Sequence, residues 1–337
     1  MEVLHMELYK RMVETLSVSG NEERLAELIE AEVAPFADEI TRDVMGNLIV
    51  LKKGVGEAPK KLMFSAHMDE IGYMVTHIEE KGYLRFARIG GLNMLHIAGS
   101  PVIFKNGVKG YVMYETSVAP KDLTIEQFYI DIGAESREEA EQMVSVGDVA
   151  GTMGSLYEAG AHRWVSKSMD DKIACYILIR ALQQLKETRY DTYFVFSAQE
   201  EVGLRGATTA AYNIDPDYGI ALDVTSVGDM LNQKSPNAVK LGQGAAIKVR
   251  DNSIISSKRM VNFLVDVARE AGIPYQMEVL MMGGTDAGAI HLTRGGVVSG
   301  GISIPTRNVH SAVEMVDRRD VEACIALVLA LLNRDIE

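Results

Sequence analysis

The sequence predicts an α/β protein in which a small β-rich domain interrupts a larger α/β domain. Three observations lead to this prediction: helix and strand patterns alternate in the second half of the chain, the middle is rich in short strands and glycines, and the first strands again have α/β character. Alternating helices and strands are typical of a sheet that helices cover on both faces. We therefore predict a discontinuous α/β domain with a central mixed sheet, residues 1–67 and 162–337, and an inserted β-rich domain, residues 68–161.

The N-terminal segment carries helical patterns followed by strand patterns. Apolar residues recur at helical spacing up to Leu16, and Ser19-Gly20-Asn21 then interrupts the pattern. A second amphipathic helix is predicted over residues 22–33. Residues 47–51 and 61–66 are apolar runs that predict strands, and these strands belong to the first piece of the α/β domain.

The predicted insert consists of short strand patterns separated by glycines. Asn106-Gly107 stands between two apolar runs, and both residues accept the positive φ angles of a tight turn, so the pair predicts a β-hairpin. One helix is predicted near residues 136–143. These features predict a β-rich unit that is distinct from the α/β sheet on either side of it.

The second half of the chain returns to alternation. Its pattern predicts strands over residues 192–197, 218–222 and 296–304, and helices over residues 171–185, 258–271 and 319–332. In an open α/β sheet, ligand sites form at the edge where the carboxyl ends of the strands lie. That edge is therefore the place to look for functional residues.

Composition and charge exclude several classes of function. The chain has 337 residues and a net charge of −13 at pH 7, from 34 basic and 47 acidic residues. This balance argues against binding to nucleic acids or to anionic membranes, which depends on clustered Lys and Arg. The N-terminal segment lacks the apolar core of a signal peptide. The two cysteines, Cys175 and Cys324, lie in apolar helical patterns, and these features together predict a cytoplasmic protein with buried free thiols.

Residues that can bind metal follow four of the predicted strands. His67 ends one strand, Glu200-Glu201 follows another, Asp223 follows a third, and His310 comes after the last. A lone histidine is more often an ordinary loop residue, and an adjacent pair of glutamates is usually a solvated turn. Four strand ends with matching chemistry, however, predict one common site at the edge of the sheet.

Asp170 and Asp171 add two carboxylates at the start of a predicted helix. Each could simply cap the helix, because aspartate at a helix N-terminus interacts favourably with the helix dipole. Consecutive acids before an apolar helix can also bridge metal ions. Histidine and carboxylate ligands without thiolates are typical of Zn²⁺, Co²⁺ or Mn²⁺, and the set is larger than one structural zinc ion requires.

Two neighbouring acids can support this set. Asp69 lies two residues after His67, on the same side of an extended chain, where it can orient the imidazole. Glu200 and Glu201 point in different directions, so that one can bind metal while the other serves as a general base. The sequence contains neither a CxxC pair nor a GxSxG motif, so a thiolate zinc site and a serine hydrolase are not predicted.

Six motifs occur in order along the chain: AHMDEIG (66–72), SMDDK (168–172), SAQEEVGLRGA (197–207), ALDVT (221–225), GGTDAGAI (283–290) and IPTRNVHSAVE (304–314). Together with the early SVSGNEE segment, they resemble the M42 family of metallo-aminopeptidases, the tetrahedral aminopeptidases, over nearly the whole chain. The sequence departs from the common pattern of that family at Lys172, Asn308 and Ala312, none of which is a candidate ligand.

The resemblance implies a metallopeptidase α/β domain that binds two divalent metal ions per subunit. Zn²⁺ and Co²⁺ are the ions that we expect first, with Mn²⁺ as the alternative. The resemblance assigns His67 and Glu201 to one ion and assigns Asp223 and His310 to the other. It assigns Asp170 to both ions as a bridge.

The same resemblance implies the remaining roles. Glu200 would be the general base that activates a metal-bridged water, and Asp69 would orient the imidazole of His67. The peptide bond between Asp170 and Asp171 would be cis. The inserted domain would mediate dimerisation, and dimers would assemble into a tetrahedral dodecamer. The implied activity is that of an aminopeptidase, which hydrolyses N-terminal residues from peptide substrates.

Two other activities remain open. A polysaccharide hydrolase, for which relatives of the family carry an endoglucanase label, needs two carboxylates about 5 Å or more apart on either side of the sugar. The consecutive Glu200 and Glu201 do not by themselves give this spacing, and the two histidines would have no role. Another metal-dependent deacylase would share the same reaction centre.

Overall fold

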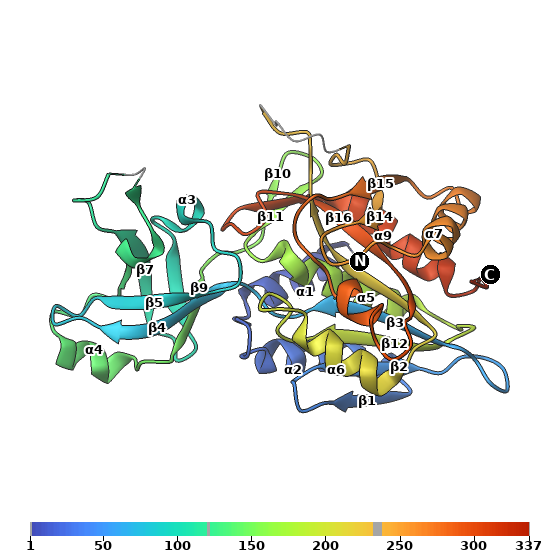
Figure 1. The fold of residues 1–337 in the computed structure, drawn as a ribbon, viewed down its shortest axis with the longest axis horizontal. Helices are drawn as coiled ribbons and strands as arrows, with labels where there is room; N and C mark the ends of the chain where they lie inside the picture. The colour runs from blue at the N-terminus through green and yellow to red at the C-terminus, as the bar shows by residue number, and fades with distance from the viewer. Residues whose placement is uncertain (1, 120–121, 232–237, 337) are drawn as a thin grey trace.

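Two sheets, one large and one small, organise the chain. The computed structural model describes residues 2–119, 122–231 and 238–336. Figure 1 shows the small sheet standing beside a larger part in which helices lie against a long sheet. The predicted fold class, an α/β domain with a central mixed sheet and a separate small β-rich unit, is confirmed.

The large sheet contains eleven strands within the described residues: β1 (Glu39–Arg42), β2 (Leu48–Lys52), β3 (Lys61–His67), β10 (Tyr157–Ala159), β11 (Arg163–Ser166), β12 (Asp191–Ser197), β13 (Tyr218–Ser226), β14 (Ala245–Arg250), β15 (Tyr275–Val279), β16 (Val298–Arg307) and β17 (Glu314–Asp317). Their order is β1-β2-β12-β3-β13-β16-β17-β11-β10, with β14 beside β16 and β15 beside β14. The central strands β12, β3, β13 and β16 run parallel. Their carboxyl ends therefore lie at one edge of the sheet.

Helices cover both faces of this sheet. One face carries α1 (Glu2–Glu14), α2 (Glu23–Val33) with the short turn η1 (Ala34–Phe36), α5 (Met169–Gln184), α7 (Lys258–Glu270) and α9 (Arg318–Leu331), and the other carries α6 (Arg205–Ile214) and α8 (Ala287–Ile290). Side chains alternate between the two faces of a strand. Leu62 and Phe64 accordingly join the core of the first face, whereas Met63 joins the core of the second.

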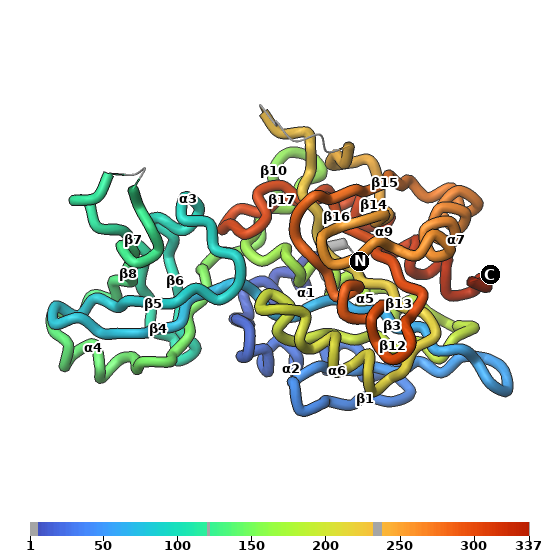
Figure 2. The backbone as a smooth tube through the Cα atoms, viewed as in Figure 1, coloured from blue at the N-terminus to red at the C-terminus, as the bar shows by residue number. Residues whose placement is uncertain are grey.

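The small sheet closes into a barrel of β4 (Gly72–Ile78), β5 (Leu84–Ile89), β6 (Pro101–Phe104), β7 (Lys109–Tyr114), β8 (Phe128–Asp131) and β9 (Val149–Thr152). The short helices α3 (Met94–Ile97), η3 (Ile125–Gln127) and α4 (Arg137–Met143) lie in its connections. The predicted hairpin is confirmed, because Asn106 and Gly107 join β6 to β7 and Gly107 has a φ of 92°. The chain enters through β4 and leaves through β9, and these two strands pair with each other. Figure 2 shows the backbone of this unit standing beside the larger part of the chain.

Some elements differ from the prediction. Strand β10 pairs with β11 in the large sheet, although the sequence prediction places these residues in the insert. Strand β1 and helix α6 are not predicted, because β1 is mostly exposed and the buried face of α6 consists largely of alanine and glycine. Such elements lack the apolar periodicity that the prediction uses. Within the residues that the structure describes, no helix is both long and apolar enough to cross a membrane.

Candidate active site

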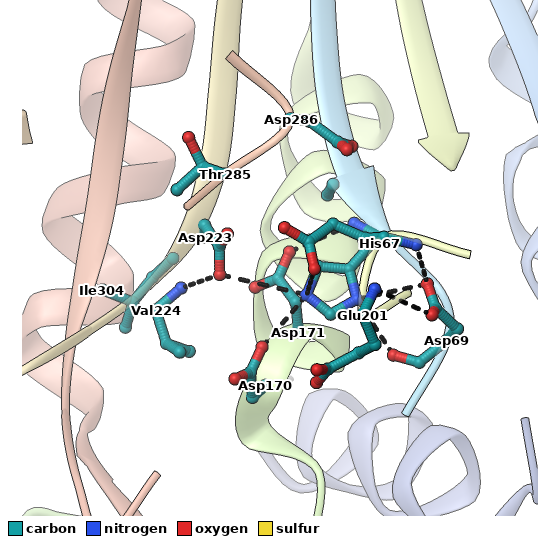
Figure 3. Close-up of polar contacts among 12 residues, drawn as sticks. His67, Asp69, Asp170, Asp171, Glu201, Asp223, Val224, Thr285, Asp286 and Ile304 are labelled. Atoms are coloured by element: carbon teal, nitrogen blue, oxygen red, sulfur yellow. Dashed lines mark hydrogen bonds and ion pairs between the residues drawn. The ribbon is translucent and has the colours of Figure 1, made fainter. Parts of the chain in front are cut away.

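The predicted ligands meet at the carboxyl edge of the parallel strands. His67 is the last residue of β3, Asp223 lies in β13, and Glu201 follows the end of β12. His310 lies in the loop between β16 and β17, and Asp170 lies in the first turn of α5. Figure 3 shows four of these side chains converging on one place: His67, Asp170, Glu201 and Asp223.

The ligand atoms form two groups that share Asp170. One group contains His67, Asp170 and Asp223, and the other contains Asp170, Glu201 and His310; within each group the ligand atoms all lie within 4.8 Å of one another. One carboxylate oxygen of Asp170 lies 3.0 Å from Nε2 of His67, and the other lies 3.1 Å from Nε2 of His310. The two oxygens of one carboxylate therefore face two different groups.

This division corrects the one that the family resemblance implied. Asp223 lies with His67, 4.0 Å from its Nε2, and Glu201 lies with His310, 3.2 Å from its Nε2. The reason is the order of the strands. Ala221 of β13 pairs with Ser65 of β3, so that two residues further on Asp223 emerges beside His67.

The start of α5 differs from an ordinary capped helix. Asp170 has a ψ of 103° and Asp171 a φ of −122°, both outside the helical region, although the helix is assigned from Met169. The peptide bond between Asp170 and Asp171 is cis, which confirms the expectation from the resemblance. Asp171 accepts a hydrogen bond from the main-chain N–H of His67, and so it supports the neighbouring strand and not the helix end.

Asp69 contacts His67 and also the backbone of the glutamate pair. Its main-chain oxygen lies 2.9 Å from Nδ1 of His67, and its carboxylate lies 3.5 Å from the same nitrogen. The carboxylate also accepts hydrogen bonds from the main-chain N–H groups of Glu200, at 2.8 Å, and Glu201, at 3.2 Å. It also accepts one from the hydroxyl of Ser19, at 2.6 Å. Asp69 thus fixes the backbone of the glutamate pair.

The Glu200 side chain has a different environment from that of Glu201. Glu201 contacts His310, whereas the Glu200 carboxylate lies 3.9 Å from Nε2 of His67 and accepts no hydrogen bond from the residues that the structure describes. Both residues are largely shielded from solvent. Glu200 therefore lies beside the ligand groups without a hydrogen bond to another side chain.

Residues of the barrel connection between β5 and β6 contact His310. The main-chain oxygen of Gly91 lies 2.8 Å from Nδ1 of His310, which leaves Nε2 directed at Asp170 and Glu201. A hydrogen bond at one nitrogen of an imidazole fixes the tautomer and the direction of the other nitrogen. The contact predicts that the position of the barrel loop influences the metal affinity of His310.

Replacing Gly91 by alanine tests that contact. A Cβ atom at Gly91 would lie 2.9 Å from Cε1 and Nδ1 of His310, so the imidazole must move. We expect the affinity for one metal ion to fall by about 10- to 100-fold, measured by calorimetric titration of the metal-free protein. Gly295→Ala is the matched control, because a Cβ atom there meets no atom within 4 Å. Equal affinities in the two variants would contradict the prediction.

The centre contains more buried acid than its histidines neutralise. Burial raises the pKa of Glu200 and of Asp223 well above their usual ranges, and the charge on nearby carboxylates adds to the effect. Burial disfavours the charged form of His310, but hydrogen bonds to Asp170 and Glu201 outweigh it and raise the pKa of this imidazole to about 12. A bound cation would lower the pKa values of these carboxylates and keep them ionised.

The residues fit divalent metal ions. Imidazole and carboxylate donors are those that Zn²⁺, Co²⁺ and Mn²⁺ accept. Two donors that share an ion at about 2.1 Å lie about 3.0 to 3.4 Å from each other. The contacts of Asp170 with His67 and His310, and of Glu201 with His310, fall within or close to that range at 3.0, 3.1 and 3.2 Å.

Other buried acids that surround the centre are not predicted from the sequence as site residues. Glu314 hydrogen-bonds to the backbones of Asp170 and His310. Asp286 accepts hydrogen bonds from the hydroxyls of Ser65 and Ser197, which lie on neighbouring strands just before the metal-binding ends. The GGTDAGAI and HSAVE motifs contain these two acids, and motif membership is the signal that could have found them.

The N-terminal SVSGNEE segment also packs against the centre. Glu22 is buried, and one of its carboxylate oxygens accepts hydrogen bonds from the main-chain N–H groups of Gly20, at 2.8 Å, and Gln199, at 3.1 Å. Gln199 precedes the glutamate pair and has a φ of 56°. Burial raises the pKa of Glu22 from 4.5 to about 7.

This shift predicts a pH dependence of stability. Between about pH 4.5 and 7 the folded state keeps the Glu22 proton that the unfolded state has lost, so this group makes stability fall as pH rises through that window. In Glu22→Gln the amide oxygen can accept both hydrogen bonds, and the side chain at position 22 no longer titrates. The unfolding free energy of the wild type should therefore fall more steeply, by up to about 1.4 kcal/mol per pH unit. Urea unfolding at pH 5, 6 and 7 measures the difference, and identical slopes would refute it.

Comparison with known proteins identifies the family. The family model described as M42 glutamyl aminopeptidase matches residues 46–327. The chain belongs to the M42 peptidase family. This M42 peptidase is 48% identical over 324 residues to a protein of Acetivibrio thermocellus that is provisionally named an aminopeptidase, with 96% of the chain and 97% of the relative covered. The family resemblance of the six motifs is thereby confirmed.

Solved structures share the fold over nearly their full lengths. An aminopeptidase of the archaeon Desulfurococcus kamchatkensis has 37% identity and a TM-score of 0.95, with 99% of this chain and 95% of that chain covered. The TET1 peptidase of Pyrococcus horikoshii, described as able to assemble into a tetrahedron or a large octahedral shell, has 32% identity and a TM-score of 0.87, with 98% and 100% covered. This M42 peptidase is a hydrolase of the aminopeptidase type.

Proposed function

We propose that this M42 peptidase is a dinuclear metal-dependent aminopeptidase that removes N-terminal residues from peptides. The observation that carries the proposal is Asp170, whose two carboxylate oxygens lie 3.0 and 3.1 Å from the imidazoles of two separate ligand groups. A carboxylate that bridges two ions has this arrangement. The proposed ligands are His67, Asp170 and Asp223 for one ion, and Asp170, Glu201 and His310 for the other.

When divalent ions are bound, they supply Lewis acidity, which lowers the pKa of water and polarises the substrate carbonyl. Side chains of the protein carry out the proton transfers and hold the reacting groups in place. Glu200 takes the proton of the attacking water and delivers it to the leaving amine, a role for which its carboxylate is close to the ligands and held by none of them. Asp69 keeps Glu200 in place through the main chain.

Recognition of a free N-terminus needs an acid near the ligand groups. A protonated α-amino group is a cation, and a carboxylate that bound metal keeps ionised can pair with it, whereas a blocked, neutral amide gains no such pair. Peptides with a free terminus should therefore bind and acylated peptides should not.

A panel of aminoacyl chromogenic amides, their N-acetylated counterparts and carboxymethylcellulose tests the function. The protein is treated with chelator and then reloaded with Zn²⁺, Co²⁺ or Mn²⁺. Cleavage of free aminoacyl amides that disappears on chelation and returns on reloading is expected. Cleavage of acetylated substrates would favour a deacylase, and cleavage of the polysaccharide would favour a glycoside hydrolase. Activity that persists after chelation would show that the reaction does not require metal.

We further propose that the inserted domain, which contains the barrel of residues 72–152, is a dimerisation domain and that dimers form a tetrahedral dodecamer. Its surface exposes apolar side chains, which is typical of an interaction surface: Met74, Tyr83, Leu95, Tyr111 and Val146. The relative from P. horikoshii assembles into closed shells. Light scattering coupled to size exclusion measures the mass, and a monomer at micromolar concentration would contradict the proposal.

We also propose that the protein is located in the cytoplasm. Both cysteines are free and buried, which fits a reducing compartment.

A further inference from the structure

One buried carboxylate connects the two ligand residues that come from opposite ends of the second half of the chain. Glu314, the first residue of β17, is buried. One of its oxygens accepts a hydrogen bond from the main-chain N–H of Asp170 at 2.9 Å, and the other accepts one from the main-chain N–H of His310 at 2.7 Å. Glu314 thus holds the backbones of two proposed ligands without offering an atom to the ligand groups.

Both backbones need such support. Asp170 has a ψ of 103°, outside the helical region of the helix that it begins. His310 has a φ of 62°, in the left-handed region that a residue with a side chain seldom adopts. Neither residue is held by a regular ladder of hydrogen bonds at that point. The directions of their side chains therefore depend on the contacts of their main chains, and Glu314 makes one contact to each.

The two ligand groups depend on Glu314 to different extents. Asp170 and His310 both belong to the group with Glu201, so Glu314 fixes two of its three members. In the other group, His67 and Asp223 are residues of the paired central strands β3 and β13, and only Asp170 is attached to Glu314. A disturbance at Glu314 should therefore affect the first group much more than the second.

We propose that Glu314 is a positioning residue that controls the affinity of the centre for the ion held by Asp170, Glu201 and His310. The proposal rests on the dinuclear centre proposed above. Glutamine at this position has a single acceptor oxygen, and its NH₂ group would face one of the two main-chain donors. One of the two ligand backbones would lose its partner, and the ligand geometry of that group would relax.

The experiment compares Glu314→Gln with Asp320→Asn. Asp320 is buried in α9, and its two oxygens accept hydrogen bonds at 2.7 Å from the main-chain N–H groups of Gly242 and Gly244. The same chemical change there removes the same kind of support from a loop that holds no ligand. Both variants and the wild type are stripped of metal and titrated calorimetrically with Zn²⁺, and their melting temperatures without metal are recorded.

The wild type should bind two ions. In Glu314→Gln the affinity for one ion should fall by about 10- to 100-fold, the range for residues that orient metal ligands, while the other changes little. Asp320→Asn should bind both ions as the wild type does, whatever its loss of thermal stability. The absorption spectrum of Glu314→Gln with Co²⁺ should match that of His310→Ala and differ from that of His67→Ala, because this comparison identifies which ion is lost.

Unchanged affinities in Glu314→Gln, or equal losses in both variants, would overturn the positioning role. If Glu314→Gln does not fold, Glu314→Asp replaces it: the shorter side chain keeps its charge but cannot reach both main-chain donors, and the same selective loss is expected. Fewer than two ions in the wild type would overturn the dinuclear centre itself and the inference with it, and this outcome is distinct from the others.

Discussion

Replacing Glu200 by glutamine is expected to lower kcat by about 10²- to 10⁴-fold, the usual contribution of a general base, while two metal ions stay bound. The Glu200 carboxylate lies 3.9 Å from Nε2 of His67 and belongs to neither ligand group. An amide of the same shape leaves the ligands in place but cannot take a proton. Steady-state kinetics with an aminoacyl amide and elemental analysis of the purified variant measure the two effects.

The neighbouring residue supplies the control for this experiment. Glu201→Gln makes the same chemical change one position further on, at a side chain that lies 3.2 Å from Nε2 of His310. This variant should lose metal, and added metal should restore part of its activity. Near-normal turnover in Glu200→Gln would show that another group is the base, and loss of metal from Glu200→Gln would show that Glu200 is a ligand.

The strand ends are the part of the centre that the sequence predicts best. Buried parallel strands have continuous apolar runs, and the residue that follows such a run lies at a defined edge of the sheet. His67 and Asp223 lie at that edge for this reason. Asp170 could not be separated from a helix cap by pattern alone, because only its backbone angles and its two imidazole neighbours distinguish it.

The division of the ligands between two groups depends on which strands are neighbours. In sequence order β3 is followed by the whole barrel, and nothing in the pattern says that β13 pairs with β3 on one side while β12 pairs with it on the other. The resemblance implied a different division, and the strand register corrects it. The catalytic and ligand roles of the individual residues stay predictions until the variants are measured.

Residues that act through the backbone are the least predictable. Glu314 and Glu22 belong to motifs, but the pattern of residues around them does not show their role, because an acid that accepts main-chain hydrogen bonds has the same local sequence as an exposed one. Glu22 reaches Gln199, and Glu314 reaches Asp170, across more than a hundred positions of the chain. Only the folded arrangement of loops around the sheet edge brings these partners together, so sequence periodicity carries no information about them.

Replacing Asp170 by asparagine is expected to remove the bridge and to reduce the bound metal to less than one ion per chain. Each ligand group includes one oxygen of this carboxylate, and an asparagine side chain offers one oxygen and no charge. We expect Asp170→Asn to lose about 4 kcal/mol of transition-state stabilisation, which is part of what bound metal supplies. This loss corresponds to a fall of about 10³-fold in kcat/KM. Elemental analysis and kinetics at saturating metal measure both effects.

Asp171→Asn is the matched control for the bridge. Asp171 is adjacent and also buried, but its carboxylate accepts a hydrogen bond from the main-chain N–H of His67, which an asparagine oxygen can also accept. This variant should keep two ions. If Asp170→Asn also kept two ions with wild-type affinity, Asp170 could not be the bridge. Loss of both ions from Asp171→Asn would instead mean that the charge of the neighbouring acid is part of the centre, since the hydrogen bond to His67 is preserved.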